Sequence, residues 1–443
     1  MARRVWGVVL TVAVVLAVSG PAFAQQNRLD AVTPMAPERA AYGSLPVGVR
    51  TLTATDRGRV DVLNTTEGGS TVRYDRTLTI EVWYPAVLAA GQPAGGDYRT
   101  VARDPSRAAI LYGRAVRDAA PAAAAGGYPL VILSHGYPGN RYLLGHLGEN
   151  LASKGFIVAS IEHPDSTYDD QKAFASTLYN RPFDQLFVLN ELERLSRRGS
   201  GSALAGLIDV SRTAIVGYSM GGYGLVNVLG AGFTDARVTA SGAPPNRLLF
   251  ERAASNPAYP KEADRRIKAA IAIAPWGWPA GAWDARGLSA ITTPILFVAG
   301  SADDVSGYEK GTRAMFLGTT RADRYLLTFL HGSHNVAAPI PAPAEAYAYS
   351  EALGAFPFMH YADGVWDAVR SNNILQHFAT VFLSIHLKGE HDAQAFLDLV
   401  PRGSDGVYSV ERDGRHKPDY TYWKGFGQRT AVGLMLERLR PGQ

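Results

Sequence analysis

The chain has 443 residues, of which 47% are hydrophobic, so it can bury a large core, and one domain with extensions is the expected organisation. Its formal charge of +4 includes Arg3 and Arg4, and 4 − 2 leaves +2 for the remainder. This small charge gives no reason to expect nucleic acid or an acidic membrane surface as a partner. The sequence contains no cysteine, which excludes disulfides, thiolate metal sites and a thiol nucleophile.

The N-terminal segment has the pattern of a secretory signal peptide. Arg3 and Arg4 precede an apolar run over residues 5–18, and Ala22-Phe23-Ala24 offers the small residues that signal peptidase reads. The alternative is a membrane anchor, but the run is shorter than the roughly 20 residues that a span needs. We therefore predict a signal peptide over residues 1–24, cleavage after Ala24, a secreted or periplasmic protein, and no transmembrane segment after signal removal.

A catalytic domain is predicted to follow a short leader. Residues 25–46 are polar and contain proline, and we expect them to be loosely ordered. Residues 47–84 read as strands, because Thr77–Tyr84 alternates polar and apolar residues as a half-buried strand does. We assign residues 47–443 to the domain.

From residue 128 onward, short apolar runs alternate with longer amphipathic segments. Strands that are apolar on both faces belong in a parallel sheet covered by helices. Residues 183–195 carry a leucine stripe typical of such a helix. The sequence thus predicts an α/β fold, with a mostly parallel sheet and helices on both faces. The apolar runs are Leu130–Leu133, Phe156–Ile161, Thr213–Val216, Ala269–Ala274, Ile295–Val298 and Tyr325–Phe329.

Two segments exceed what a minimal sheet of this kind requires. Residues 232–266 separate one strand and its helix from the next strand, and we consider them a candidate cap insertion over the site. Residues 337–443 form a C-terminal extension with a helical pattern over residues 373–387.

The sequence Gly217-Tyr-Ser219-Met-Gly221 carries the clearest chemical signal. It follows an apolar strand and precedes a helical pattern, which is the context of a nucleophile elbow. Glycines are needed there because side chains would clash in so tight a turn, and the turn lifts the Ser219 hydroxyl clear of the sheet. An ordinary tight turn is the alternative reading. We predict that Ser219 is the nucleophile.

A serine hydroxyl needs a base and an acid, which this kind of fold supplies in the chain order serine, acid, histidine. The strand over residues 295–298 runs into Asp303 and Asp304, at the strand end where active-site groups lie. We choose Asp303 as the acid. Asp304 remains a rival, and either could instead be a turn or capping residue.

Histidines follow the next strand, over residues 325–329. We choose His334 as the base, because it lies further into the loop than His331 and can bend back toward Ser219. His377, in a helical pattern, reads as structural. His163 is a weaker candidate for the pocket lining.

An oxyanion hole requires two backbone N–H donors. One is expected from Met220, the residue after the nucleophile, and the other from Tyr137, because Gly136 permits the turn that aims its N–H into the site. His135 reads as a residue that orders this loop. Trp276, after the strand over residues 269–274, is predicted to form a substrate-binding wall, with plain packing as the alternative.

The sequence shows no phosphate-binding glycine loop and no histidine or carboxylate cluster at metal spacing. We therefore expect neither a cofactor nor a metal. The expected partner is a small-molecule, lipid or polymer ester. The sequence does not indicate the oligomeric state.

These motifs resemble a known group of α/β-hydrolases. Leu133–Arg141, Glu149–Ala159, Glu162-His163 and Gly217–Gly222 are similar to the pattern of dienelactone hydrolase-like and platelet-activating-factor acetylhydrolase-like proteins. Bacterial cutinase-type polyester hydrolases are more distantly similar. The features shared with those hydrolases are Gly136-Tyr137, Ala274–Trp276, Asp303–Val305 and Gly332–His334.

The resemblance covers about residues 47–335 and part of the C-terminal extension, and it implies an α/β-hydrolase fold. Two departures matter. Dienelactone hydrolases use a cysteine, which this chain lacks. Animal platelet-activating-factor acetylhydrolases carry the acid after the sixth strand, where this chain has Ala274. The resemblance therefore favours the bacterial arrangement, with the acid at Asp303 or Asp304.

The expected activity is hydrolysis of carboxylic esters through a Ser-His-Asp triad and an acyl-enzyme. Small esters, lipid or phospholipid esters and polyesters all remain open as substrates. An amidase or peptidase using the same triad is the first alternative. A non-catalytic binding protein on the same fold is the second, against which the intact triad order counts.

Overall fold

The computed structural model describes residues 27–259 and 262–443. The signal peptide predicted over residues 1–24 lies outside this part of the chain. Within the described ranges, no helix combines the length and the apolar character that a bilayer crossing requires.

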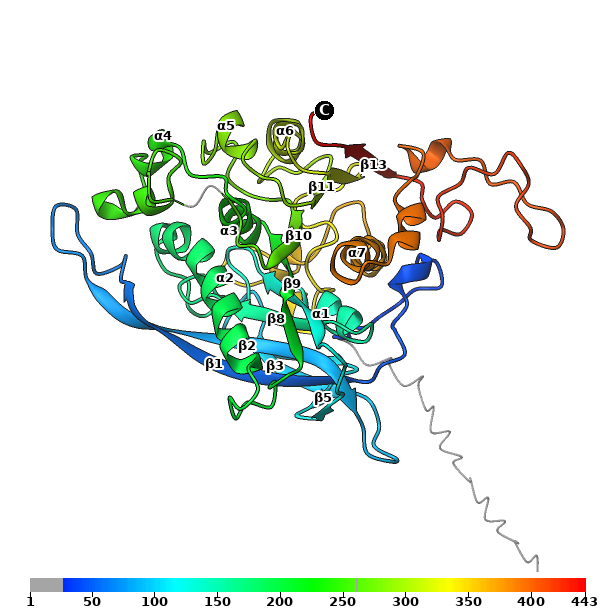
Figure 1. Cartoon of the computed structure of the whole chain (residues 1–443), viewed down its shortest axis with the longest axis horizontal. Coiled ribbons are helices and arrows are strands. Elements are labelled where there is room, and N and C mark those ends of the chain that lie inside the picture. The colour runs from blue at the N-terminus through cyan, green and yellow to red at the C-terminus, as the bar shows by residue number, and fades with distance from the viewer. Residues whose placement is uncertain (1–26, 260–261) are drawn as a thin grey trace, which may run out of the picture.

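One large twisted sheet organises the molecule, in the order β13-β12-β11-β10-β9-β7-β8-β2-β1-β5, with β6 paired to β2 (Figure 1). The strands from β8 through β7, β9, β10 and β11 to β12 are parallel to their neighbours. This confirms the predicted mostly parallel α/β sheet. The bounds of these strands are β7 Tyr128–Ser134, β8 Ile157–Glu162, β9 Ile208–Tyr218, β10 Ile267–Ile273, β11 Ile295–Gly300 and β12 Arg324–Phe329.

Antiparallel strands flank this parallel centre. On one side, β1 and β2 form a long hairpin, and on the other side β13 pairs with β12. A separate two-stranded sheet, β3 with β4, was not predicted. The bounds are β1 Val47–Val60, β2 Arg73–Val87, β3 Gly96–Val101, β4 Ala108–Gly113, β5 Val116–Arg117, β6 Ala120–Pro121 and β13 Leu434–Leu439.

Helices cover both faces of the parallel centre of the sheet, which explains why the strands there are apolar on both faces. Along β7, Val131 and Leu133 join the core under α1 and α7, whereas Leu130 and Ile132 join the core under α2 and α3. Successive side chains of a strand point to opposite faces, so each face needs its own apolar set. The helices are α1 Gly145–Ala152, α2 Phe174–Ser196, α3 Met220–Val228, α4 Asp235–Val238, α5 Ala285–Leu288, α6 Arg313–Gly318 and α7 Ala368–Leu383.

The segments outside the minimal fold pack onto it. In the described part of the expected leader, the Leu29 amide donates to the Tyr112 carbonyl at 3.0 Å, and Leu29 is buried. In the candidate cap, Phe233 stacks on Tyr223 of α3. The C-terminal extension supplies α7 to one face and β13 to the sheet edge.

Candidate functional site

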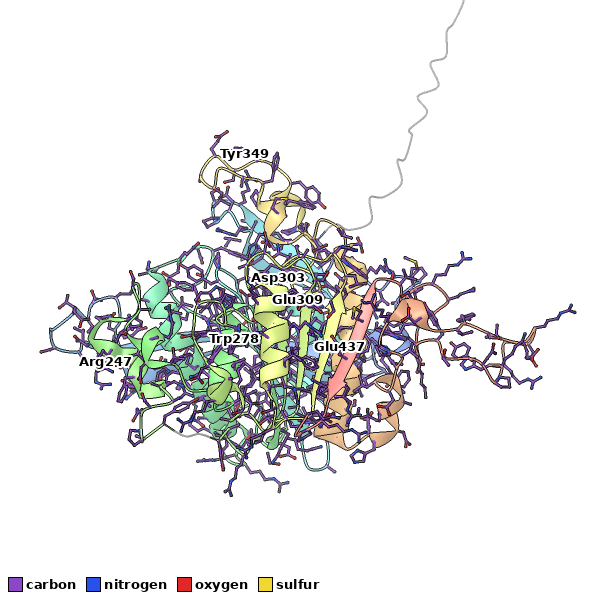
Figure 2. All side chains as sticks on the ribbon, turned by 90° about the horizontal axis from the view of Figure 1, so that it is seen from above. Arg247, Trp278, Asp303, Glu309, Tyr349 and Glu437 are labelled. Carbon is purple, nitrogen blue, oxygen red and sulfur yellow. The ribbon has the colours of Figure 1, made fainter. Side chains whose placement is uncertain are left out.

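The residues predicted to form the catalytic triad lie at the carboxyl ends of the parallel strands. Ser219 follows β9, Asp303 follows β11 and His334 follows β12. Figure 2 shows Asp303 near the end of the central strands, on the side from which the loop carrying Tyr349 projects. In open α/β sheets this is the edge where ligands bind.

A sharp turn presents Ser219. Its backbone adopts φ 51° and ψ −111°, a conformation that side-chain-bearing residues rarely occupy. The turn is held by the Ser219 amide, which donates to the Ile273 carbonyl at 2.9 Å, and by the Trp276 amide, which donates to the Ser219 carbonyl at 3.1 Å. The strained conformation is thus stabilised by bonds to the neighbouring strand and loop.

The glycines around Ser219 are required by close backbone contacts. A Cβ on Gly217 would lie 2.4 Å from the Gly221 carbonyl oxygen, and one on Gly221 would lie 1.9 Å from the Ser134 carbonyl oxygen. A Cβ on Gly222 would lie 2.8 Å from Pro275 Cα. These contacts bring the first turn of α3 directly against the end of β7.

Ser219, His334 and Asp303 form a continuous hydrogen-bonded chain. His334 Nε2 lies 3.0 Å from Ser219 Oγ, and His334 Nδ1 lies 3.0 and 3.1 Å from the two oxygens of Asp303. The three residues are each less than 10% exposed. An ionised carboxylate only accepts hydrogen bonds, so Nδ1 of a neutral His334 carries the proton and Nε2 is free to accept one from Ser219.

The turn after β11 selects Asp303 over Asp304. One Asp303 oxygen accepts the amides of Val305 at 2.9 Å and Ser306 at 2.8 Å. Burial raises the pKa of Asp303, but the hydrogen bonds from His334 and these amides outweigh it, and the net pKa lies below the ordinary value. Asp304 is exposed. Asp303 is therefore the carboxylate that stays ionised beside the histidine.

The two histidines after β12 have different environments. His331 is exposed and its amide donates to Ser301 Oγ at 2.8 Å, whereas His334 lies against the Tyr218 ring with the ring centroids 5.3 Å apart. Tyr218 also donates its hydroxyl to Asn335 Oδ1 at 2.8 Å. Tyr218, the residue before Ser219, thus holds the loop that carries His334, a contribution that sequence reasoning missed.

Two backbone N–H groups belong to the segments beside Ser219, those of Met220 and Tyr137. The Met220 N–H lies in the first turn of α3, where a helix leaves its amides unpaired and its dipole favours negative charge. The Tyr137 N–H donates to no other group within the described residues. A Cβ built on Gly136 would lie 3.3 Å from Ser219 Cβ, so the Tyr137 loop passes directly beside Ser219.

An aromatic row lines the same region. The Tyr137 and Phe174 rings meet edge to face at 5.1 Å, and the Phe174 and Trp276 rings do so at 5.3 Å. All three side chains are half-buried. Trp276 is therefore joined to the Tyr137 loop through Phe174, a residue that was not identified from the sequence.

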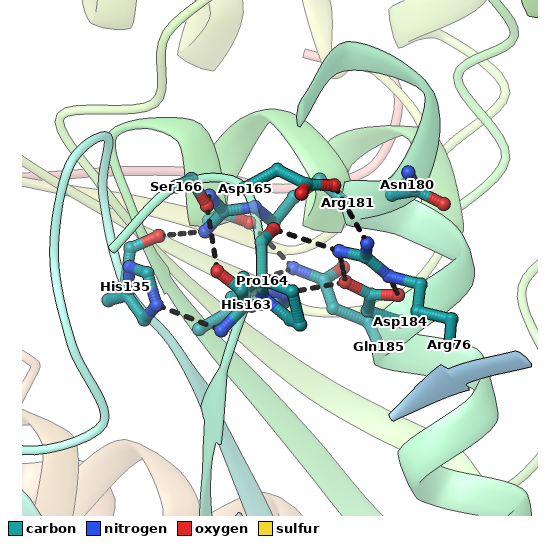
Figure 3. A network of polar contacts seen from close by, with 12 residues as sticks. Arg76, His135, His163, Pro164, Asp165, Ser166, Asn180, Arg181, Asp184 and Gln185 are labelled. Carbon is teal, nitrogen blue, oxygen red and sulfur yellow. Dashed lines mark hydrogen bonds and ion pairs between the residues drawn. The ribbon is translucent and has the colours of Figure 1, made fainter. Parts of the chain in front are cut away.

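Three other histidines considered from the sequence, His135, His163 and His377, are buried in polar contacts. His135 Nε2 accepts the His163 amide at 3.1 Å, while His163 contacts Ser134 Oγ at 2.9 Å and Asp184 at 3.0 Å (Figure 3). Burial lowers the pKa of His163 to about 3. His377, which lies in α7, accepts the Arg39 amide at 3.1 Å. His135 thus orders the Tyr137 loop, and His163 lies in a buried network.

In the described part of the chain, no three carboxylate or imidazole side chains are grouped as metal ligands.

Comparisons with known proteins agree with this architecture. Residues 92–246 match the family model of PET hydrolase-like proteins. A platelet-activating factor acetylhydrolase of Cavia porcellus is 28% identical over 223 residues, which cover 41% of this chain and 43% of that protein. Cutinase 2 of Thermobifida cellulosilytica is 35% identical over 101 residues, 23% of this chain and 34% of the cutinase. The matched segments therefore span less than half of these relatives.

Among solved structures, a ferulic acid esterase from Streptomyces cinnamoneus superimposes with a TM-score of 0.55. The alignment covers 83% of this chain and 94% of the esterase at 22% sequence identity, so it bears on the fold. Together with the sheet order and the strand–turn–helix at Ser219, this superposition shows that the chain has the α/β-hydrolase fold.

Proposed function

We propose that this protein is an exported serine hydrolase that cleaves carboxylic esters through an acyl-enzyme on Ser219. The observation that carries the proposal is the 3.0 Å contact between Ser219 Oγ and His334 Nε2, with Asp303 on the other ring nitrogen. The names of the relatives, which are esterases, cutinases and an acetylhydrolase, support ester bonds as the target.

The geometry accounts for the first chemical step. As Ser219 Oγ attacks the ester carbonyl carbon, His334 Nε2 takes its proton, and Asp303 stabilises the imidazolium that forms. The carbonyl oxygen becomes an oxyanion that accepts hydrogen bonds from the Met220 and Tyr137 amides. Removing one such donor typically costs about 10²–10³ in rate.

The second half of the reaction uses the same groups in reverse. The tetrahedral intermediate collapses, and the leaving alkoxide takes the proton from His334 Nε2. A water molecule then attacks the acyl-enzyme while His334 accepts its proton, and a second collapse frees the acid and restores Ser219. Trp276, with Phe174, forms one wall along which the acyl or alcohol part of the substrate lies.

The test compares p-nitrophenyl esters from acetate to palmitate with the matched p-nitroanilides, using the mature protein and Ser219→Ala. Ester turnover that Ser219→Ala abolishes supports the proposal. Preferential turnover of the anilides would favour an amidase instead. A profile that peaks at short chains would point to small esters, whereas activity on palmitate would point to lipid-type substrates. Release of soluble products from a polyester film tests for polymer hydrolysis.

Export is the second part of the proposal. It rests on the signal-peptide pattern of residues 1–24, and N-terminal sequencing of the protein recovered outside the cytoplasm tests it. A mature chain that begins at Gln25 supports export, whereas an intact Met1 terminus contradicts it.

A further inference from the structure

Arg181 is a buried cation without an acidic partner. It lies on α2 and is 1% exposed, yet no carboxylate of the described residues lies within 4.0 Å of its guanidinium. The neighbouring Asp184 pairs instead with Arg59, Arg76 and His163. Burial lowers the pKa of Arg181 to about 9. A charge buried in this way is costly unless its hydrogen bonds are satisfied.

The guanidinium is satisfied by the loop that carries the proposed oxyanion donor. Arg181 donates to the His135 carbonyl, to the Gly136 carbonyl at 3.5 Å and to Ser166 Oγ at 2.8 Å (Figure 3). The chain makes room for it, because a Cβ on Gly224 of α3 would lie 2.7 Å from Arg181 Cγ.

The Gly136 carbonyl is also held from within the loop. His135 Nδ1 lies 2.7 Å from the Gly136 carbonyl oxygen, while His135 Nε2 accepts the His163 amide. Burial, reinforced by the charge of Arg181, keeps the pKa of His135 well below its ordinary value, so the ring is neutral. A neutral ring that accepts at Nε2 carries its proton on Nδ1 and donates it to Gly136.

This carbonyl and the Tyr137 N–H belong to the same peptide group. In a planar trans peptide the C=O and N–H point in opposite directions, so donors that fix the oxygen also fix the N–H. With its carbonyl bound on one side, the Gly136–Tyr137 peptide presents its N–H on the other. Rotation of this peptide would lose the hydrogen bond from His135 and the contact with Arg181.

We propose that Arg181 is a positioning residue, which holds the Gly136–Tyr137 peptide in the orientation that an ester oxyanion requires. The inference rests on the proposed function and deepens it. The positive charge of Arg181, buried behind the Gly136–Tyr137 peptide, also favours the negative charge that develops on the substrate oxygen. Electrostatic effects of this kind are strong where water is excluded.

The experiment compares Arg181→Met and Arg181→Lys with the wild type. We expect Arg181→Met to lower kcat on p-nitrophenyl butyrate by roughly tenfold to a hundredfold, less than full loss of an oxyanion donor, with KM within about twofold. Arg181→Lys keeps the positive charge but lacks the planar guanidinium with its several N–H donors, so it should recover part of kcat. Phenylboronic acid, whose serine adduct mimics the tetrahedral intermediate, should bind Arg181→Met more weakly by a similar factor.

Arg324 provides the matched control. It is also fully buried and holds backbone carbonyls, those of Phe316 and Gln443 at 2.6 Å, but it lies at the start of β12, the end of the strand away from Ser219. Arg324→Met should lower the melting temperature and leave kcat and boronate affinity unchanged.

Four outcomes separate the possibilities. A folded Arg181→Met with kcat within twofold of wild type overturns the inference and leaves the proposed function intact. Equal losses of kcat in Arg181→Met and Arg324→Met also overturn it, because they indicate general destabilisation. If Arg181→Met does not fold, unchanged kcat and boronate affinity in Arg181→Lys overturn it. A wild type without Ser219-dependent turnover would overturn the proposed function itself.

Discussion

His334 Nε2 lies 3.0 Å from Ser219 Oγ, although 115 positions separate the two residues in the chain. The parallel sheet brings them together, because β9 and β12 end at the same edge. The contact depends on the loop after β12 folding back, with Asn335 bound to Tyr218 beside the nucleophile. This relationship makes specific predictions for each member of the site.

Asp303 and Asp304 form a natural matched pair of variants. Asp303→Asn should lower kcat by about 10³–10⁴, because an amide cannot stabilise the imidazolium and favours the wrong tautomer of His334. Asp304→Asn should leave kcat unchanged, since Asp304 is exposed. Steady-state kinetics on p-nitrophenyl butyrate check both. A larger loss for Asp304→Asn would show that the turn after β11 is arranged differently in the active protein.

His334 and His331 provide a second pair in one loop. His334→Ala removes the base and should lower kcat by at least about 10⁴, with KM little changed. His331→Ala removes an exposed ring and should keep kcat within twofold. The same assay measures both variants, and substantial residual activity in His334→Ala would assign the base elsewhere.

Trp276 is expected to act on substrate binding. Trp276→Ala should raise KM for p-nitrophenyl hexanoate and longer esters by roughly tenfold, which corresponds to about 1.4 kcal/mol of lost apolar contact. The effect on acetate should be smaller, because less of that ester reaches the wall. Trp278→Ala is the control, a half-buried tryptophan of the same loop. Equal effects on all chain lengths would indicate that Trp276 only packs the loop.

Buried histidines should make the protein sensitive to acid. Burial lowers the pKa of His377 to about 3, so the folded state keeps this ring neutral where the unfolded chain, with an ordinary pKa near 6.5, binds a proton. Stability is therefore lost as pH falls from about 6.5 toward 3, by about 2 kcal/mol between pH 7 and pH 5 for this one group.

Urea unfolding at pH 7 and pH 5 measures this loss. His377→Gln should reduce the difference between the two pH values by about 2 kcal/mol, whatever its effect at pH 7. His391→Gln, at an exposed position, should leave the difference unchanged. Equal pH dependence in wild type and His377→Gln would show that His377 is not held neutral.

The sequence predicted the centre of the sheet because burial on both faces leaves a simple pattern. The run over residues 130–133 is apolar at every position, and the structure divides it between two cores. The helix predicted over residues 183–195 begins earlier, at Phe174, and continues through Pro182. The leucine stripe becomes regular only after that proline, so the first turns could not be recognised from periodicity.

The triad was predicted as a chain order, whereas its geometry depends on turns that the sequence does not specify. Asp303 and Asp304 carry the same carboxyl group, and the fold distinguishes them. Asp303 is buried against His334 and accepts the amides of Val305 and Ser306, whereas Asp304 is exposed. Arg181, on α2, could not be identified from the sequence, because the His135 and Gly136 carbonyls that it binds lie 46 and 45 positions away, in the loop after β7. Strand β13 was missed for the same reason, since its partner β12 is distant in sequence.

The central claim is that Ser219 is the nucleophile, and labelling with a fluorophosphonate tests it most directly. Intact-mass measurement followed by peptide mapping should find one adduct per chain, on the peptide that contains Ser219, with ester hydrolysis lost in proportion to labelling. An adduct on another residue, or a protein that hydrolyses esters yet resists labelling at Ser219, would contradict the account.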